Sequence, residues 1–293
     1  MKSTFQVGGV PEHFNYPWQV AIERGKFKPA GLTVKWSDYP GGTGAMCSAL
    51  REGKLDIAIL LTEGITTDII KGNSSKIVQF YVNSPLRWGI HVGAQSSIQH
   101  LDELKGKKYA ISRFKSGSHL MSFVHASQYG WQIQEDDFEL VKDLTGAREA
   151  LSTNGDLAFL WEKFTTRPFV DNGELRYLGE CKTPWPCFVV AVREEVLENN
   201  ADQVRQILRL VNETCREVKN DSRVPEILAW RYNLKLGDAR EWFNEVEWTG
   251  APDLKLDSLE KVLNTLCDLR IIEQPVPVEE LTHPIDEQDL ICQ

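Results

Sequence analysis

The sequence of 293 residues lacks several features, and each absence excludes a class of protein. No apolar run approaches the ~18 residues of a membrane-spanning helix, so no membrane span is predicted. Basic residues number only 33 against 42 acidic ones, whereas nucleic-acid-binding proteins usually carry a basic face. Low-complexity segments are also absent, which argues against wholesale disorder. We therefore expect a globular chain with neither a membrane span nor a nucleic-acid partner.

Cysteines with metal-binding spacing and a secretory signal are missing as well. The six cysteines do not form a zinc-finger or CxxC pattern, so free thiols are expected and no metal site. They are Cys47, Cys181, Cys187, Cys215, Cys267 and Cys292. The N-terminal segment has no apolar core or small-residue cleavage site, which favours a cytoplasmic protein.

The negative charge of the chain is concentrated at its C-terminal end. Residues 273–293 hold six acidic side chains and no Lys or Arg, so the net charge of −9 becomes −3 without them. The rest of the chain is nearly neutral. Its charge is therefore compatible with an anionic ligand, and the Pro-rich tail from Gln274 is expected to wrap the surface.

Strand and helix patterns alternate along the first two thirds of the chain, as in a mostly parallel, helix-covered sheet. Strands are expected at 4–10, 32–36, 56–61, 76–82, 88–92, 108–111, 138–141, 157–160, 175–178 and 187–192. Helices are expected at 17–25, 41–50, 62–71, 116–129 and 146–152. Apolar residues recur at helical spacing in 201–218 and 256–266, so the last third is predicted to be helical.

The apolar segment 187–192 is expected to return to the first of two α/β units. The chain would then cross twice between two lobes. We predict one lobe from residues 1–89 and 191–293, and the other from residues 90–190. Ligands of open α/β sheets bind beyond the carboxyl ends of the strands, so a site is expected there.

Four segments, taken in order, resemble a known superfamily. They are Val20–Phe27 leading into Ala30-Gly31-Leu32-Thr33-Val34, Gly41–Gly44, Ala49–Ala58, and Leu104–Lys108 followed by Ser116-Gly117-Ser118. The chain resembles the type II periplasmic-binding-protein-like superfamily, in the branch that contains nitrate-, sulfonate- and taurine-binding proteins and thiamine-pyrimidine synthases. The resemblance implies an α/β Venus-flytrap fold of two lobes, with mixed, mostly parallel sheets flanked by helices, that closes on a small molecule in the inter-lobe cleft.

Candidate ligand-binding residues lie where helices begin just beyond strands. Helix N-termini present unpaired N–H groups and partial positive charge, which favour an anionic or hydrogen-bond-accepting ligand. The alternative interpretation is a set of ordinary strand-to-helix turns. The candidates are Pro11, Glu12, His13, Phe14, Tyr16, Gly41, Gly42, Thr43, Thr62, Glu63, Gly64, Trp88, Arg113, Ser116, Gly117, Ser118, His119, Trp161 and Glu162.

Some of these side chains suggest particular contacts. Arg113 is suited to clamp a carboxylate, phosphate or sulfonate through two hydrogen bonds. The Phe14 and Tyr16 rings are suited to stack on a planar ligand. Glu162, and Glu63 in the other lobe, are suited to bind an amine or amidine such as a pyrimidine carries; alternatively, each is a carboxylate favoured by the helix dipole.

The leading hypothesis is a cytosolic small-molecule-binding protein, monomeric or homodimeric, with a polar ligand that is anionic or pyrimidine-like. No cofactor is expected. The alternative is an enzyme on the same fold, such as a lyase, a dehydratase or an enzyme of thiamine-pyrimidine synthesis, with pyridoxal phosphate or iron as its cofactor. His13, Glu63 and Glu162 would be its acid–base candidates. However, GxSxG, HExxH and P-loop motifs are absent, and Asn15-Tyr16 replaces the Asn-His pair that the pyrimidine-synthesising branch carries.

Overall fold

The computed structural model describes residues 2–285, and the chain divides into two compact units. Unit 1 contains the chain up to Ser84, Trp185–Ile227 and the chain from Phe243. Unit 2 contains Pro85–Pro184 and Leu228–Trp242. The predicted boundaries after residues 89 and 190 therefore differ from the observed ones. The sheet of unit 2 already begins at Arg87, and Asp238 and Glu241 form ion pairs with unit 2.

The sheet of unit 1 has the strand order β2-β1-β3-β10-β4. The strands are β1 (Thr4–Gly9), β2 (Thr33–Asp38), β3 (Ile57–Leu61), β4 (Ser75–Val82) and β10 (Phe188–Arg193). β1 pairs in parallel with β2 and β3, whereas β10 runs antiparallel between β3 and β4. The predicted return of residues 187–192 to the first unit is confirmed. β3 and β10 are rich in β-branched and aliphatic residues because both are buried in the centre of the sheet.

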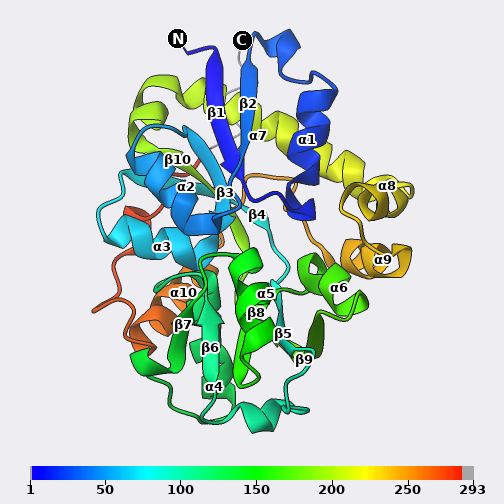
Figure 1. Cartoon of the computed structure of the whole chain (residues 1–293). Helices are drawn as coiled ribbons and strands as arrows, with labels where there is room; N and C mark the ends of the chain where they lie inside the picture. The colour runs from blue at the N-terminus through cyan, green and yellow to red at the C-terminus, as the bar shows by residue number, and fades with distance from the viewer. Residues whose placement is uncertain (1, 286–293) are drawn as a thin grey trace. The chain divides into compact units, whose positions relative to one another are not determined.

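Helices cover both faces of this sheet (Figure 1). They are α1 (Tyr16–Glu23), α2 (Gly42–Arg51), α3 (Thr62–Ile70), α7 (Glu194–Asn220) and α10 (Leu256–Asp268). The connection through α1 runs in one direction across the sheet and those through α2 and α3 in the other. Right-handed crossovers therefore place α1 on one face and α2 and α3 on the opposite face. α7 packs against α1, and α10 packs against α3.

Unit 2 repeats this topology with the strand order β7-β6-β8-β5-β9. Its strands are β5 (Arg87–Gly93), β6 (Lys108–Ile111), β7 (Phe138–Leu140), β8 (Leu157–Glu162) and β9 (Leu175–Lys182). Its helices are α4 (Gly117–Gln128), α5 (Leu144–Thr153) and α6 (Lys163–Asp171). β5 runs antiparallel between β8 and β9, as β10 does between β3 and β4. In this correspondence the β8–α6 junction of unit 2 is equivalent to the β3–α3 junction of unit 1.

Two C-terminal segments cover β4, the edge strand of the unit 1 sheet. The backbone of Ile77 donates to Leu281 and accepts from His283, at 2.8 and 2.9 Å. Further along β4, the Phe80 N–H donates to the Asp253 carbonyl at 2.8 Å. An uncovered edge strand would offer unpaired backbone groups to other chains. The predicted surface wrapping by the tail is thus seen as far as residue 285; residues 286–293 lie outside the described part.

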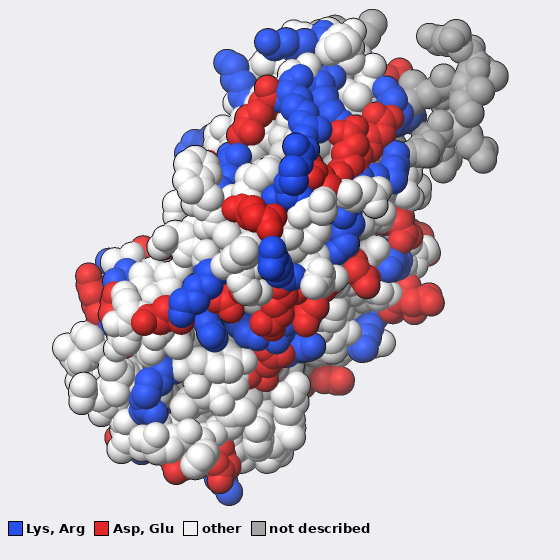
Figure 2. All heavy atoms as spheres, turned by 90° about the vertical axis from the view of Figure 1, so that its right-hand side faces the viewer, with Lys and Arg blue, Asp and Glu red and all other residues white. Residues whose placement is uncertain are grey.

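Helices α8 (Val224–Arg231) and α9 (Leu236–Glu245) complete the elements of the last third. Among residues 2–285, no helix is both long and apolar enough to cross a membrane. On the face seen in Figure 2, Lys and Arg are interleaved with Asp and Glu over the described residues rather than gathered into one basic patch.

Candidate functional site

The carboxyl ends of β1, β2 and β3 meet at one edge of the unit 1 sheet because these strands are parallel. The loops that follow them carry the candidate residues 11–16, 41–43 and 62–64. β10 runs the other way, so the residues before it reach the same edge: Thr62 donates from its hydroxyl to the Pro186 carbonyl at 2.6 Å, and from its N–H to Cys187 at 3.0 Å. The topology thus gathers the unit 1 candidates along a single edge.

The first of these loops is packed into the protein. Residues 13–15 form a buried 3₁₀ turn, and the Phe14 carbonyl accepts hydrogen bonds from the Tyr81 hydroxyl and the Trp248 indole, both at 2.9 Å. The Phe14 ring contacts His13 and Phe188, with ring centroids 5.1 and 4.9 Å apart. Burial lowers the pKa of His13 to about 3, so its imidazole is neutral near pH 7. Ligand stacking on Phe14 and Tyr16 stays a prediction.

The starts of α2 and α3 are fitted closely together. The Thr43 hydroxyl accepts a hydrogen bond from the Leu61 N–H at 3.1 Å, which ties α2 to the end of β3. A Cβ atom at Gly64 would lie 2.4 Å from the Thr43 methyl group, so glycine allows this close approach. Gly42 adopts a φ of +68° at the entry to α2. The backbone N–H groups of both helices therefore begin near the same point of the sheet edge.

Glu63 is the buried acidic residue of this edge. It is the second residue of α3, is 2% exposed, and accepts a hydrogen bond from the Trp185 indole at 2.9 Å. Burial raises the pKa of Glu63 to about 7, although the hydrogen bonds from its own backbone and from Trp185 lower it. The contact between Trp185 and Glu63 was not predicted from the sequence.

In unit 2, the candidate serines bond mainly to their own loop. Ser116 caps α4 by accepting from the His119 N–H, and the Ser118 hydroxyl accepts from the Ser112 N–H at 3.1 Å. Arg113 is half-buried in the loop between β6 and this helix. The serine hydroxyls therefore organise the start of α4.

His119 lies within a cluster of aromatic side chains. Its Nδ1 accepts from the Lys115 N–H at 3.2 Å, and its ring lies 4.6–5.5 Å from the rings of Phe114, Phe123 and Phe138. Burial, followed by the charge of Lys115, lowers the pKa of His119 to about 4. His119 is accordingly a neutral residue near pH 7.

Trp88 and Glu162 face one another across the β5–β8 pair. The Glu162 carboxylate caps α6 through the N–H and hydroxyl of Thr165, so the structure shows the helix-start role that was the alternative for this residue. Burial raises the pKa of Glu162 to about 7, against the hydrogen bonds from Thr165 and Phe164 and the Arg87 charge, which lower it. Trp161 stacks on Phe159, with ring centroids 5.4 Å apart.

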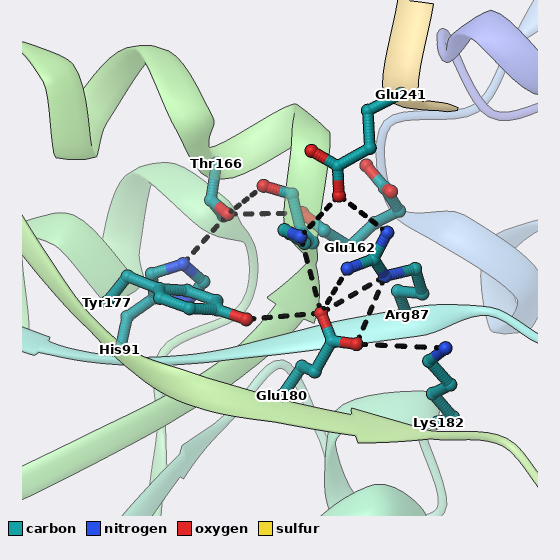
Figure 3. Close-up of polar contacts among 9 residues, drawn as sticks. Arg87, His91, Glu162, Thr166, Tyr177, Glu180, Lys182 and Glu241 are labelled. Atoms are coloured by element: carbon teal, nitrogen blue, oxygen red, sulfur yellow. Dashed lines mark hydrogen bonds and ion pairs between the residues drawn. The ribbon is translucent and has the colours of Figure 1, made fainter. Parts of the chain in front are cut away.

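A polar cluster beside these residues was not predicted (Figure 3). Arg87 pairs with Glu180 at 2.7 Å and Glu241 at 2.8 Å, and Lys163 lies 3.0 Å from Glu241. The Tyr177 hydroxyl donates to Glu180 at 3.1 Å. The members are far apart in sequence and follow no motif, so no sequence signal marks the cluster. It attaches α9 to β5, β9 and α6 within unit 2.

No group of three or more His, Cys, Asp or Glu within residues 2–285 is placed to hold a metal ion. The cysteines of this range are free thiols, buried except for the half-buried Cys267; Cys292 lies outside it. The candidate residues offer helix N–H groups, hydroxyls, the buried carboxyls of Glu63 and Glu162, and the Arg113 guanidinium. This chemistry is suited to binding a small polar molecule.

Comparison with known proteins identifies the class of fold. The chain has the type II periplasmic-binding-protein fold that the sequence predicted, and residues 88–181 match the family model described as Ca3427-like PBP. The structure of the Candida albicans CA3427 gene product, described as defining a new family with the generic periplasmic binding protein fold, is 28% identical, with a TM-score of 0.89 over 97% of each chain.

Two sulfonate-binding proteins share the fold at lower identity. The alkanesulfonate-binding protein SsuA from Xanthomonas axonopodis pv. citri, bound to MOPS, is 14% identical, with a TM-score of 0.80 over 97% of this chain and 99% of its own. The aliphatic sulphonate binding protein SsuA from Escherichia coli is 15% identical, with a TM-score of 0.66 over 98% and 94%. No curated protein matches the sequence.

Proposed function

We propose that this protein binds a small polar molecule, anionic or pyrimidine-like, through the loops at the carboxyl edges of its sheets. The observation that carries the proposal is the convergence of the starts of α2 and α3 on one edge, beside a buried carboxyl. Converging helix N-termini favour ligands with acceptor oxygens. The likeness to sulfonate-binding proteins supports the same class of ligand. Closure of the lobes on the ligand stays a prediction from the resemblance.

A thermal-shift screen of sulfonates, carboxylates, pyrimidines and pyridoxal phosphate tests this proposal, because a ligand that binds only the folded state raises its melting temperature. Arg113→Ala should weaken the response to anionic compounds. Arg148→Ala is the matched control, since Arg148 pairs with Glu174 on the surface of unit 2. If no compound raises the melting temperature, the proposed binding function is wrong.

An enzyme on the same fold is a second candidate, favoured by one observation. A carboxyl whose pKa is about 7, as that of Glu63 is, is suited to move a proton at neutral pH. Turnover of a compound from the screen, lost in Glu63→Gln while binding persists, would support the enzyme. Binding without turnover would favour the binding protein.

The proposed cytoplasmic location and the proposed monomer or homodimer rest on the sequence. Fractionation of cells that express the full natural chain tests the first, and light scattering of the purified protein tests the second.

A further inference from the structure

A buried carboxyl lies just beyond each end of β3, and the two differ in whether they have a positively charged partner. Asp56 precedes the strand, is 1% exposed, and accepts hydrogen bonds from the Lys2 ammonium at 2.6 Å and the Gln6 N–H at 2.8 Å. Glu63 follows the strand, is 2% exposed, and forms no ion pair with a described Lys, Arg or His. Burying a carboxylate without a positive partner is costly. The negative charge of Asp56 is therefore balanced by the Lys2 ammonium, whereas Glu63 has no such cationic partner among the described residues.

The two oxygens of Glu63 also differ. Oε2 accepts the hydrogen bond from Trp185, whereas Oε1 is buried and accepts none from residues 2–285. Trp185 is itself 2% exposed, so the indole holds the carboxyl in a fixed orientation. One oxygen of a well-oriented buried carboxyl is thus left for a donor that the described protein does not supply. A buried acceptor is usually completed by a donor from protein, water or a bound molecule.

The equivalent position of unit 2 gives an internal comparison. Glu162 stands at the β8–α6 junction, as Glu63 stands at the β3–α3 junction, and is similarly buried. Its carboxylate is occupied by Thr165, whose N–H and hydroxyl lie 2.6 and 2.8 Å away. No side chain of α3 donates to the Glu63 carboxyl; the Thr67 hydroxyl donates to the Glu63 carbonyl instead. Of the two glutamates predicted to bind an amine or amidine, Glu63 is the better placed.

Charged groups around Glu63 do not account for its raised pKa. α3 packs against α2, α10, β3 and β10. Arg51 of α2 pairs with Asp68, Arg193 of β10 pairs with Glu195, and β3 contains no titratable residue. Glu63 makes no described hydrogen bond or ion pair with Cys47 of α2 or with any titratable residue of α10. The titratable residues of α10 are Asp257, Glu260, Lys261, Cys267 and Asp268. Burial is therefore the dominant influence on its pKa, which it raises.

We propose that the Glu63 carboxylate, oriented by Trp185, binds an N–H-bearing group of the ligand, such as an ammonium, an amidinium or the amino group of a pyrimidine, and that binding releases a proton. A cationic or N–H donor favours the ionised carboxylate, so the protonated fraction gives up its proton when the donor arrives. This inference rests on the proposed function. It narrows the ligand to molecules that combine acceptor groups with an N–H donor.

Matched pairs of probes test the recognition. Taurine is compared with ethanesulfonate, and 4-amino-2-methylpyrimidine with 2-methylpyrimidine, by isothermal titration calorimetry. A charge-assisted hydrogen bond predicts that the N–H-bearing member of a bound pair binds about tenfold to a hundredfold more tightly. Glu63→Gln should remove most of this preference, and Trp185→Phe should reduce it. Asp56→Asn, which changes the buried carboxyl at the other end of β3, should retain it.

Proton release gives a second readout. Titration of taurine in phosphate and in Tris, buffers with different ionisation enthalpies, should report proton release that is larger at about pH 6 than at about pH 8. Glu63→Gln should abolish this release. The folding of each variant is checked by its thermal unfolding.

The outcomes separate the two proposals. If probes bind but the pairs are bound equally, or Glu63→Gln keeps both the preference and the proton release, the assignment of Glu63 is wrong and the binding function stands. If no probe of either kind binds, both proposals fail.

Discussion

The Glu162 carboxylate accepts two hydrogen bonds from Thr165, one from its N–H at 2.6 Å and one from its hydroxyl at 2.8 Å. These contacts provide an acceptor for a backbone N–H group at the start of α6. Because Pro168 removes a backbone hydrogen bond within this helix, the cap at its first turn contributes to its stability. Glu162→Ala should lower the free energy of unfolding by about 0.5–2 kcal/mol, the usual cost of removing a helix cap. Urea unfolding measures the loss.

Asp143→Ala serves as a reference for the cost of losing a helix cap in this protein. The Asp143 side chain caps α5 by accepting from the Gly146 N–H at 2.9 Å. Glu162→Gln keeps one acceptor oxygen and should cost less than Glu162→Ala. Full stability of Glu162→Ala would contradict a capping role for Glu162.

Buried histidines should make the protein unstable in acid. Burial lowers the pKa of His13 to about 3 and those of His91, His119 and His125 to about 4. In the unfolded chain a histidine titrates near pH ~6.5, so unfolding takes up protons below that pH. Each histidine then makes the free energy of unfolding fall by about 1.4 kcal/mol per pH unit as the pH drops from ~6.5 towards its folded pKa.

The buried glutamates act in the opposite direction. Burial raises the pKa values of Glu63 and Glu162 to about 7, so their contribution to stability falls as the pH rises from ~4.5 to ~7. Because the histidines outnumber them, the net free energy of unfolding should still rise between about pH 5 and about pH 6.5. Urea unfolding across this range checks the sign. His91→Gln should flatten the slope, and a slope equal to that of the unmodified protein would contradict the prediction.

The sequence predicted the strands well because the buried ones carry a strong local signal. β3 and β10 are short runs of aliphatic residues, and both lie where 56–61 and 187–192 were expected. Helices α6, α8 and α9 were not predicted. α6 contains Pro168 and two adjacent threonines, which are poor helix formers, and its start is capped by Glu162. α8 has no clean apolar stripe, since Trp230 is 85% exposed while Leu228 is buried.

The candidate site also has one part that the local sequence predicted and another part that depends on the folded chain. The position of Glu63 at the start of a helix follows from the local pattern of strand, glycine and helix. Its partner Trp185 lies 122 residues further along the chain, and no local signal connects the two. The pair formed by Arg87 and Glu180 is likewise created by the alignment of β5 with β9. Contacts that depend on strand order become visible only in the folded chain.

Gly64 should tolerate no side chain unless Thr43 gives way. The Cβ of alanine at this position would lie 2.4 Å from the Thr43 methyl group, so Gly64→Ala should push the starts of α2 and α3 apart. We expect a loss of about 1–3 kcal/mol in the free energy of unfolding, as for other overpacked sites. Thr43→Ser removes the methyl group but keeps the hydroxyl that accepts from Leu61, so the double variant should recover much of the loss. Additive losses, measured by urea unfolding of both single variants and the double variant, would contradict this close approach.

Gln79 and Asn212 form a reciprocal pair of buried amides between β4 and α7. Each side chain donates to the oxygen of the other, at 2.9 and 3.1 Å, and both residues are at most 2% exposed. Gln79→Leu leaves the Asn212 amide without its partner, so it should cost about 1–3 kcal/mol, and Asn212→Leu should cost a similar amount. The double variant leaves neither amide stranded. Its loss should therefore be smaller than the sum of the single losses, and a double-mutant cycle by urea unfolding that gives strict additivity would show that the two amides do not depend on each other.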